Sequence, residues 1–347
     1  MNTQFLTLSK MNSHNETVCP PVKQDLSLTV VLCLVYMLGL ILNGFSLWVF
    51  IFRMSKWHAG TLLQFNLAIS DLLASPATPL MVAYFVKGNW DFGSFLCQFK
   101  IALISAHFYG SIMFLTLISI HRYVVVVHFK RSSPLKRKTF VKKLCFGLWC
   151  FLLIGAIVYA VQLPVTEEDG HKQCLSIHQS KHISKYFIIN FVLFVLGFLM
   201  PFITAVVCYS CLARSVTKVN VNSLHGQSVK AKSLKMIGIC LLIFGICFFP
   251  LNVTRTVAVV LKMYYPNNCQ LLIKTETAYY SSYVLAGINC CLDPLIYFFG
   301  SHNFNKAFRG SVRIVRQTQE RDNRTESETS CSANRNAVYS ISSGVVL

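Results

Sequence analysis

A few charged side chains lie inside long apolar stretches of this 347-residue chain, and their chemistry needs an explanation. They are Asp71, Lys100, Arg122, Arg255 and Asp293. A charge at membrane depth is costly, so such residues usually pair, hold an ion or bind a ligand. The two carboxylates are suited to a cation or a proton, and the arginines to an anion or a conformational latch.

The two aspartates belong to a group of polar residues at comparable depths in their apolar segments. With Asp71 and Asp293 stand Asn43, Ser111 and Asn289. These side chains are suited to holding a cation with water, or alternatively to a hydrogen-bonded network that only joins the helices. His107 precedes Ser111 by one helical turn and can face the same group. Protonation of His107 would then make cation binding by this group sensitive to pH.

The elements that position these residues are membrane helices. Apolar residues make up 54% of the chain and charged residues 13%, too apolar for an ordinary soluble domain. Seven windows are long enough for a hydrocarbon core of about 30 Å, and they lack the alternation of a β-barrel. We therefore predict an all-α integral membrane protein, a bundle of seven transmembrane helices, with windows at 27–52, 61–86, 97–128, 141–163, 186–212, 234–262 and 275–299.

Basic residues in the loops predict the orientation. Lysine and arginine are concentrated in the loops after the first, third and fifth windows, above all in residues 130–143. Because basic loops stay in the cytoplasm, we expect an extracellular N-terminus in a multi-pass plasma-membrane protein. The net charge of +19 does not indicate nucleic-acid binding, since the charge forms short clusters between apolar segments.

The chain divides into four predicted regions. An extracellular N-terminus (1–26) precedes the transmembrane domain (27–299). Residues 300–316 form a short amphipathic eighth helix on the inner leaflet, because Phe304 and Phe308 lie four apart between basic residues. Residues 317–347 are a polar cytoplasmic tail, predicted to be disordered and rich in serine and threonine that can be phosphorylated.

Cysteines and sequons test this topology. Cys19, Cys97, Cys174 and Cys269 fall on the expected outer side, where three pairings are open to them. Of three glycosylation sequons, only the one at Asn15 lies outside, so we expect sugar there alone.

A set of motifs in a fixed order resembles the rhodopsin-like class of G-protein-coupled receptors. The set comprises Asn43, the LAISD stretch ending in Asp71, Cys97, HRY at 121–123, Trp149, Pro201 with Tyr209, CFFP at 247–250 and DPLIY at 293–297. Within that class, the segment 109–123, the HRY form and the CFFP form resemble the purinoceptor group and its relatives for small anions and lipids.

The resemblance implies how the protein works. A ligand would bind at the outer side and shift the bundle between two packings, opening an inner cavity for a heterotrimeric G protein. The residues implied in this switch are Arg122, Tyr209, Phe248, Pro250, Asp293 and Tyr297. A sodium site is implied at Asp71, Ser111 and Asn289, with no other cofactor. The disulfides that we expect are Cys97–Cys174 and Cys19–Cys269, the second pair resembling the purinoceptor group.

The chain departs from the class pattern beside Arg122. His121 replaces the usual acid, and Lys230 and Lys232 stand where a restraining acid is often found. We therefore expect a loosely latched inactive state with measurable basal signalling.

The ligand prediction rests on one cation. Nucleotide-binding relatives have a histidine and a cation in helix 6 and a further cation in helix 7, whereas here Asn252 and Arg255 stand in helix 6 and the 275–299 window has no lysine or arginine. Half of a phosphate clamp is missing, so a carboxylate or lipid phosphate is favoured over a nucleotide. Further expected lining residues are Lys100, Tyr109, Tyr279, Tyr280 and Tyr283.

Other functions are weaker interpretations. No acid lies between residues 97 and 120, as an aminergic receptor would need, and no lysine in 275–299, as an opsin would need. No nucleophile–base motif indicates an enzyme. The alternative is a transporter or channel, which would favour inverted repeats. Expected partners are an inhibitory or phospholipase-activating G protein, receptor kinases and arrestin at the tail, and membrane lipid.

Overall fold

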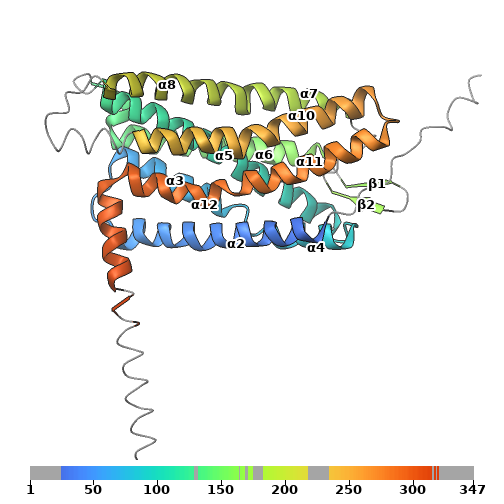
Figure 1. Ribbon diagram of the computed structural model, residues 1–347, viewed down its shortest axis with the longest axis horizontal. Coiled ribbons are helices and arrows are strands. Elements are labelled where there is room, and N and C mark those ends of the chain that lie inside the picture. Colours follow the sequence, from blue (N-terminus) through green and yellow to red (C-terminus); the bar gives the residue numbers. More distant parts are fainter. Residues whose placement is uncertain are drawn as a thin grey trace, which may run out of the picture.

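The computed structural model describes residues 25–128, 132–163, 165–168, 171–174, 183–217 and 234–314, with 316, 317 and 319. The described chain is a bundle of long helices (Figure 1). Six continuous helical segments are long and apolar enough to cross a membrane, as expected: Leu26–Arg53, Gly93–Val127, Lys138–Val161, Ile183–Val216, Leu234–Tyr264 and Cys269–Gly300.

These segments comprise α-helices and shorter π-helical stretches, written η. The order is α2 (Leu26–Trp48), η1 (Val49–Arg53), α5 (Gly93–Val127), α6 (Lys138–Val161), α7 (Ile183–Val192), η4 (Leu193–Leu199), α8 (Met200–Thr217), η5 (Ile243–Phe248), α10 (Phe249–Tyr264), α11 (Cys269–Gly287) and α12 (Asn289–Gly300). A 3₁₀ turn, η2 (Pro134–Lys136), precedes α6.

The second expected helix is broken, which corrects the continuous window at 61–86. It consists of α3 (Ala59–Leu72) and α4 (Thr78–Lys87), joined by turns at residues 73–77. Pro76 cannot donate to the helical ladder and disfavours helical geometry at Ser75, whereas Pro79 lies in the first turn of α4, where no helical hydrogen bond is lost. Together α3 and α4 supply the seventh span.

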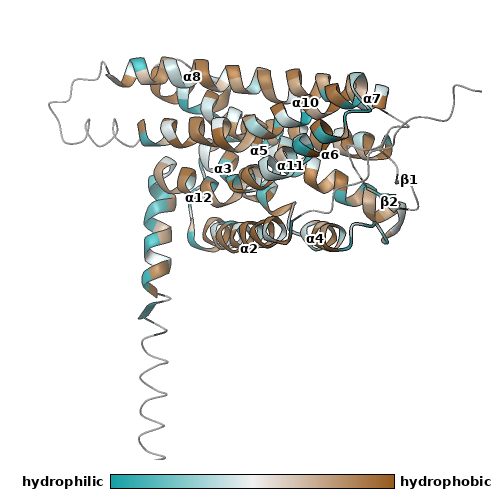
Figure 2. Ribbon diagram, turned by 45° about the vertical axis from the view of Figure 1, so that its right-hand side comes forward, coloured by the Kyte–Doolittle hydropathy of each residue, from teal (hydrophilic) through white to brown (hydrophobic). Residues whose placement is uncertain are grey.

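Helix α5 lies in the middle of the bundle. It packs against α3, α6 and α8, and 67% of its most apolar window is buried, compared with 22% in α6. Figure 2 shows hydrophobic residues on the outward faces of the helices, where Phe52 and Phe146 are each more than 70% exposed. Apolar faces of this extent are typical of helices surrounded by lipid.

Two of the proline-containing spans change their hydrogen bonding just before the proline. The Met200 N–H donates to the carbonyl of Val195, and the Phe249 N–H to that of Phe244, both five residues back. Proline lacks an N–H and crowds the carbonyl four residues earlier, so the wider π turn accommodates Pro201 and Pro250. Pro201 and Pro250 are therefore each preceded by a π-helical stretch.

One end of the bundle carries a β-hairpin, β1 (Thr166–Glu168) with β2 (His171–Gln173), which the sequence analysis did not foresee (Figure 1). The expected disulfide between Cys97 and Cys174 is present, with 5.7 Å between the Cα atoms. We call this the disulfide end. Cys269 is also disulfide-bonded, whereas Cys19 and Asn15 lie outside the described residues.

The opposite end, called the Arg122 end, carries a further helix at residues 302–314 that turns away from the direction of the bundle helices (Figure 1). Phe304 is buried against Phe50, with 4.7 Å between ring centroids, and Phe308 packs on Phe45. This aromatic contact attaches the helix to the first span. The tail after residue 319 lies outside the described residues, and so do Lys230 and Lys232.

Candidate functional site

A cavity near the disulfide end is lined by residues from α2, α5, α6, α10 and α11. Arg255 lines it together with five tyrosines, Tyr36, Tyr109, Tyr159, Tyr279 and Tyr283. Among the residues that line it, Arg255 is the one lysine or arginine. The cavity therefore offers one strong anion partner surrounded by phenol rings.

Neighbouring side chains orient the guanidinium of Arg255. Nη2 donates to Oδ1 of Asn252 over 3.0 Å, and Cζ lies 5.9 Å from the centroid of the Tyr109 ring. Nε has no hydrogen-bond partner among the described residues, although Arg255 is only 8% exposed. A buried donor without a partner is costly, so this N–H is available to a ligand.

The expected ligand residues separate into two groups. Tyr109, Tyr279, Tyr283 and Arg255 meet at the cavity, and Asn252 supports Arg255 from one helical turn away. Tyr280 instead packs on Phe85, with 5.1 Å between ring centroids, and does not line this cavity.

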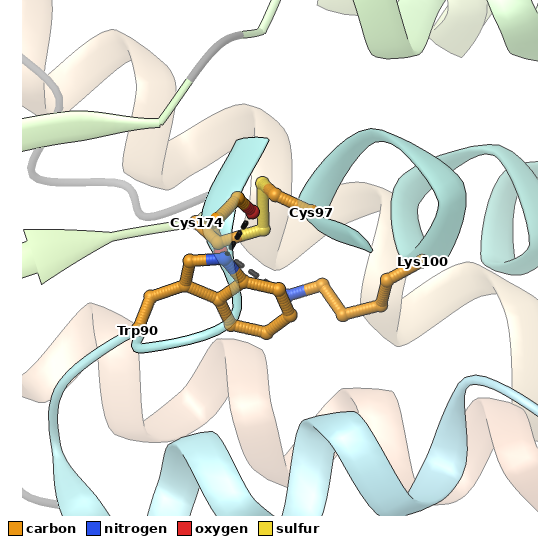
Figure 3. The surroundings of a disulfide bond; sticks show 5 residues. Trp90, Cys97, Lys100 and Cys174 are labelled. Carbon is orange, nitrogen blue, oxygen red and sulfur yellow. Dashed lines mark hydrogen bonds between the residues drawn. A yellow bond between two sulfur atoms is a disulfide. The ribbon is translucent and has the colours of Figure 1, made fainter. Parts of the chain in front are cut away.

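Lys100 also lies apart from Arg255. Its ammonium donates to the carbonyl oxygen of Cys174 over 3.2 Å and lies 4.6 Å from the centroid of the Trp90 ring (Figure 3). It stacks on Tyr84 as well, at 5.2 Å. Lys100 therefore supports the disulfide and its loop and does not line the cavity.

A second cavity opens between α5, α6 and η4. It is lined mainly by apolar groups, including Met113, Leu152, Ala156 and Leu196. Ser105, Tyr109 and Tyr159 line both cavities, so the two adjoin. Tyr159 and Tyr36 were not among the predicted lining residues, although each places a hydroxyl in an otherwise aliphatic window.

Aromatic contacts connect the cavity to the π-helical stretch before Pro250. Phe108 lines the cavity and meets Phe248 edge to face, with 5.4 Å between centroids and 87° between ring planes. Phe248 is fully buried and contacts Phe244 one turn further along. A ligand that moves Phe108 therefore acts on the bend in this helix.

The polar group that the sequence predicted is assembled at the centre of the bundle. Ser111 donates to Asp71 over 2.9 Å, while the Asn289 amide lies 3.4 Å from Asp293. Asn43 donates to the Cys290 carbonyl over 2.7 Å. His107 lies beside Asp71, with 4.0 Å between Nδ1 and Oδ1.

At the Arg122 end, the guanidinium of Arg122 donates to the carbonyl of Gly300. The hydroxyl of Tyr297 lies 3.4 Å from Oδ1 of Asn43, and Tyr209 is buried at 1% exposure. Arg122 thus joins α5 to the end of α12 through a backbone carbonyl rather than an acid.

Outside the membrane spans, Lys87 and Asp91 form an exposed ion pair with 2.9 Å between Nζ and Oδ2. The hydrogen bond from Lys87 lowers the pKa of the Asp91 carboxyl below its ordinary value. The pair lies in the loop near the disulfide and does not line the cavity.

Comparison with known proteins identifies the family. The pattern of the seven-transmembrane receptors of the rhodopsin family matches residues 42–297. The chain belongs to this family. It is therefore a G-protein-coupled receptor rather than an enzyme, and the transporter interpretation does not stand.

Relatives of the receptor include the lysophosphatidic acid receptor 6 of Gallus gallus, which is 33% identical over 274 residues, 78% of this chain and 89% of the relative. The human lysophosphatidic acid receptor 6 is 32% identical over 83% of this chain and 84% of its own length. A purinoceptor of Rattus norvegicus, purinoceptor 4, is 32% identical over 80% of this chain and 77% of its own length. The expected likeness to the purinoceptor group is confirmed.

Proposed function

We propose that this receptor responds to an amphiphilic ligand with one anionic group and an apolar chain. The observation that carries the proposal is the position of Arg255, whose side chain lies over Tyr109. Tyr109 lines both the Arg255 cavity and the apolar cavity between α5, α6 and η4, so the two cavities adjoin there. The anionic group would pair with the guanidinium, and the apolar chain would occupy the space between α5, α6 and η4.

The relatives support this ligand class without fixing it. Some are named for lysophosphatidic acid and others are purinoceptors. A nucleotide with several phosphate charges needs several charge-assisted partners, and the Arg255 cavity has one lysine or arginine among its lining residues. A lysophospholipid or a fatty carboxylate fits this single cation better.

The first experiment is a G-protein activation assay in cells, with panels of lysophospholipids, fatty carboxylates and nucleotides. We expect a response from the single-anion panels that is lost in Arg255→Gln at equal surface expression. Lys87→Ala is the matched control, because it removes an exposed cation at the same end that does not line the cavity. A nucleotide response indifferent to Arg255 would overturn the proposal.

A second variant tests the apolar chain. A side chain added at Gly155 meets nothing within 4 Å, and Gly155 lines the apolar cavity, so Gly155→Leu narrows that cavity without a clash at Cβ. We expect Gly155→Leu to weaken responses to long-chain ligands more than to short-chain ones. Gly147→Leu on the same helix, also in open space, is the control.

We also propose the orientation and the intracellular partners. The disulfide end would face the extracellular side, because the described basic segment 135–143, in η2 and the first turns of α6, lies toward the Arg122 end. The G protein would be of the inhibitory or phospholipase-activating type, and kinases and arrestin would act on the tail. An epitope tag at the N-terminus, detected on intact cells, tests the orientation.

Sodium is the allosteric cofactor that the family resemblance implies. The oxygens of Asp71 and Ser111 lie 2.9 Å apart and suit a hard cation, whereas the Asn289 amide faces Asp293. A nitrogen of His107 and the thiol of Cys290 also border Asp71. We propose sodium as a weak modulator here, tested by agonist potency in sodium-free buffer.

A further inference from the structure

Three buried side chains from three different helices meet beside the Arg255 cavity. Asp71 on α3, His107 on α5 and Cys290 on α12 are each no more than 3% exposed. Each offers one ligand atom, and these atoms lie within 4.8 Å of one another. A carboxylate, an imidazole and a thiol together form a donor set of mixed oxygen, nitrogen and sulfur.

The surrounding hydrogen bonds fix the imidazole of His107 in the form that binds a metal. Nδ1 lies 3.1 Å from the carbonyl oxygen of Ser70, which can only accept, so Nδ1 carries the hydrogen. Nε2 therefore presents its lone pair, and it lies 3.6 Å from Sγ of Cys290. A backbone carbonyl that holds one ring nitrogen is the usual support of a metal-ligating histidine.

The separation of these two donors matches one particular ion. Tetrahedral zinc with Zn–N of about 2.0 Å and Zn–S of about 2.3 Å places nitrogen and sulfur roughly 3.5 Å apart. The observed 3.6 Å between Nε2 and Sγ is close to that value. Sodium prefers oxygen donors, whereas imidazole and thiolate suit borderline or soft metals.

The carboxylate of Asp71 supplies the third donor atom, and its buried negative charge favours a bound cation. Oδ1 accepts a hydrogen bond from Ser111, whereas Oδ2 makes no well-formed hydrogen bond within the described part of the chain and has the Asp293 carboxyl and the Tyr297 hydroxyl as neighbours. Burying a carboxylate without compensation is costly, and a divalent cation would provide that compensation.

The cluster borders the Arg255 cavity near the disulfide end. His107 lines the same cavity as Arg255 and Tyr279. Three protein ligands, with water in a fourth position, would form an open zinc site.

We propose that Asp71, Nε2 of His107 and the thiolate of Cys290 bind Zn²⁺. On binding, the Cys290 thiol loses its proton to solvent and its sulfur forms a bond to the metal. The ion ties α3, α5 and α12 together, so it stabilises the packing described above and opposes the movement that opens the Arg122 end.

The test uses purified full-length receptor in detergent, treated with chelator and then titrated with Co²⁺. We expect a thiolate-to-cobalt absorption band that saturates at one cobalt per receptor and that added Zn²⁺, which is spectroscopically silent, removes. Zn²⁺ should also raise the melting temperature of the wild type, because it binds the folded state.

The matched pair of variants is Cys290→Ser and Cys291→Ser. Cys291 is the next residue, and its Sγ lies 3.4 Å from the Val35 carbonyl, away from His107. The band and the zinc-induced stabilisation should be lost in Cys290→Ser and retained in Cys291→Ser. If Cys290→Ser does not fold, His107→Gln is the second variant and should also abolish the band.

Three outcomes would overturn the proposal. One is the absence of a saturable band in the wild type. Another is a band that persists in both Cys290→Ser and His107→Gln. The third is stabilisation by sodium chloride that is equal in wild type and Cys290→Ser without any cobalt band, which would assign the cluster to sodium. None of these readouts depends on the identity of the agonist.

Discussion

Phe108 and Phe248 meet edge to face at the floor of the Arg255 cavity, with 5.4 Å between their ring centroids. Phe108 belongs to the central helix, and Phe248 ends the π-helical stretch before Pro250. The pair joins the surface that a ligand touches to the segment where the sixth span bends. π-helical stretches are frequent at functional sites, so we expect this contact to take part in the response to ligand.

Phe248→Ala should reduce the maximal G-protein response to an active ligand, because the side chain that senses Phe108 is gone. Phe249→Ala is the matched control, since Phe249 is the next residue but is 48% exposed on the outer face. The measurement is G-protein activation at saturating ligand and equal surface expression. Equal losses in both variants would contradict a specific role for Phe248.

Asn252→Ala should weaken agonist potency by about tenfold. A hydrogen bond to a charged group contributes roughly 1.5–3 kcal/mol, and Asn252 is the acceptor that holds the Arg255 guanidinium. A dose–response curve measures the shift. Thr254→Val, which removes a hydroxyl bonded to the Pro250 carbonyl on the same helix, should leave potency nearly unchanged.

Gly110→Ala should lower the stability of the receptor by about 1–3 kcal/mol, as overpacking does. A Cβ atom at Gly110 would lie 2.4 Å from Oγ of Ser70, a side chain held by the His107 carbonyl and Ser111. Thermal unfolding of purified receptor measures the effect. Gly147→Ala is the control, because its added Cβ atom meets nothing within 4 Å, and it should melt near the wild-type temperature. A Gly110→Ala receptor that also melts near the wild-type temperature would refute the steric argument.

Basal signalling should be measurable, and His121→Asp should lower it. Arg122 donates a hydrogen bond to the Gly300 carbonyl. The preceding residue is His121, so the HRY motif itself supplies no carboxylate to restrain the arginine. An aspartate would supply that partner. The check is ligand-free G-protein activity at matched expression; a wild-type receptor that is silent without ligand would count against this prediction.

Loss of the Cys97–Cys174 bond should impair folding. The bond closes a separation of 77 residues, and such a cross-link typically contributes about 2–5 kcal/mol. Lys100 also loses a fixed acceptor, because it donates to the Cys174 carbonyl. Cys97→Ser should reduce surface expression severalfold, whereas Cys150→Ser, at an exposed free cysteine, should not.

Much of the architecture follows from the sequence itself. Length and hydrophobicity define six of the spans, because a helix is the element that satisfies every backbone group inside its own segment. Asn43, Asp71, Ser111 and Asp293 could be grouped from their depths alone, since polar residues in lipid have to face the bundle interior. The disulfide between Cys97 and Cys174 was expected from family resemblance and is present.

Other features depend on how the helices rotate and pack, which one sequence does not specify. Lys100 and Arg255 both looked like ligand cations, but Lys100 packs under the hairpin loop and only Arg255 lines the cavity. The prolines indicate disturbed helices, but only the structure shows that the helix breaks between α3 and α4 and widens into π turns before Pro201 and Pro250. His107 and Cys290, 183 residues apart, form a donor pair only because α5 and α12 bring them to the same depth and face them toward each other.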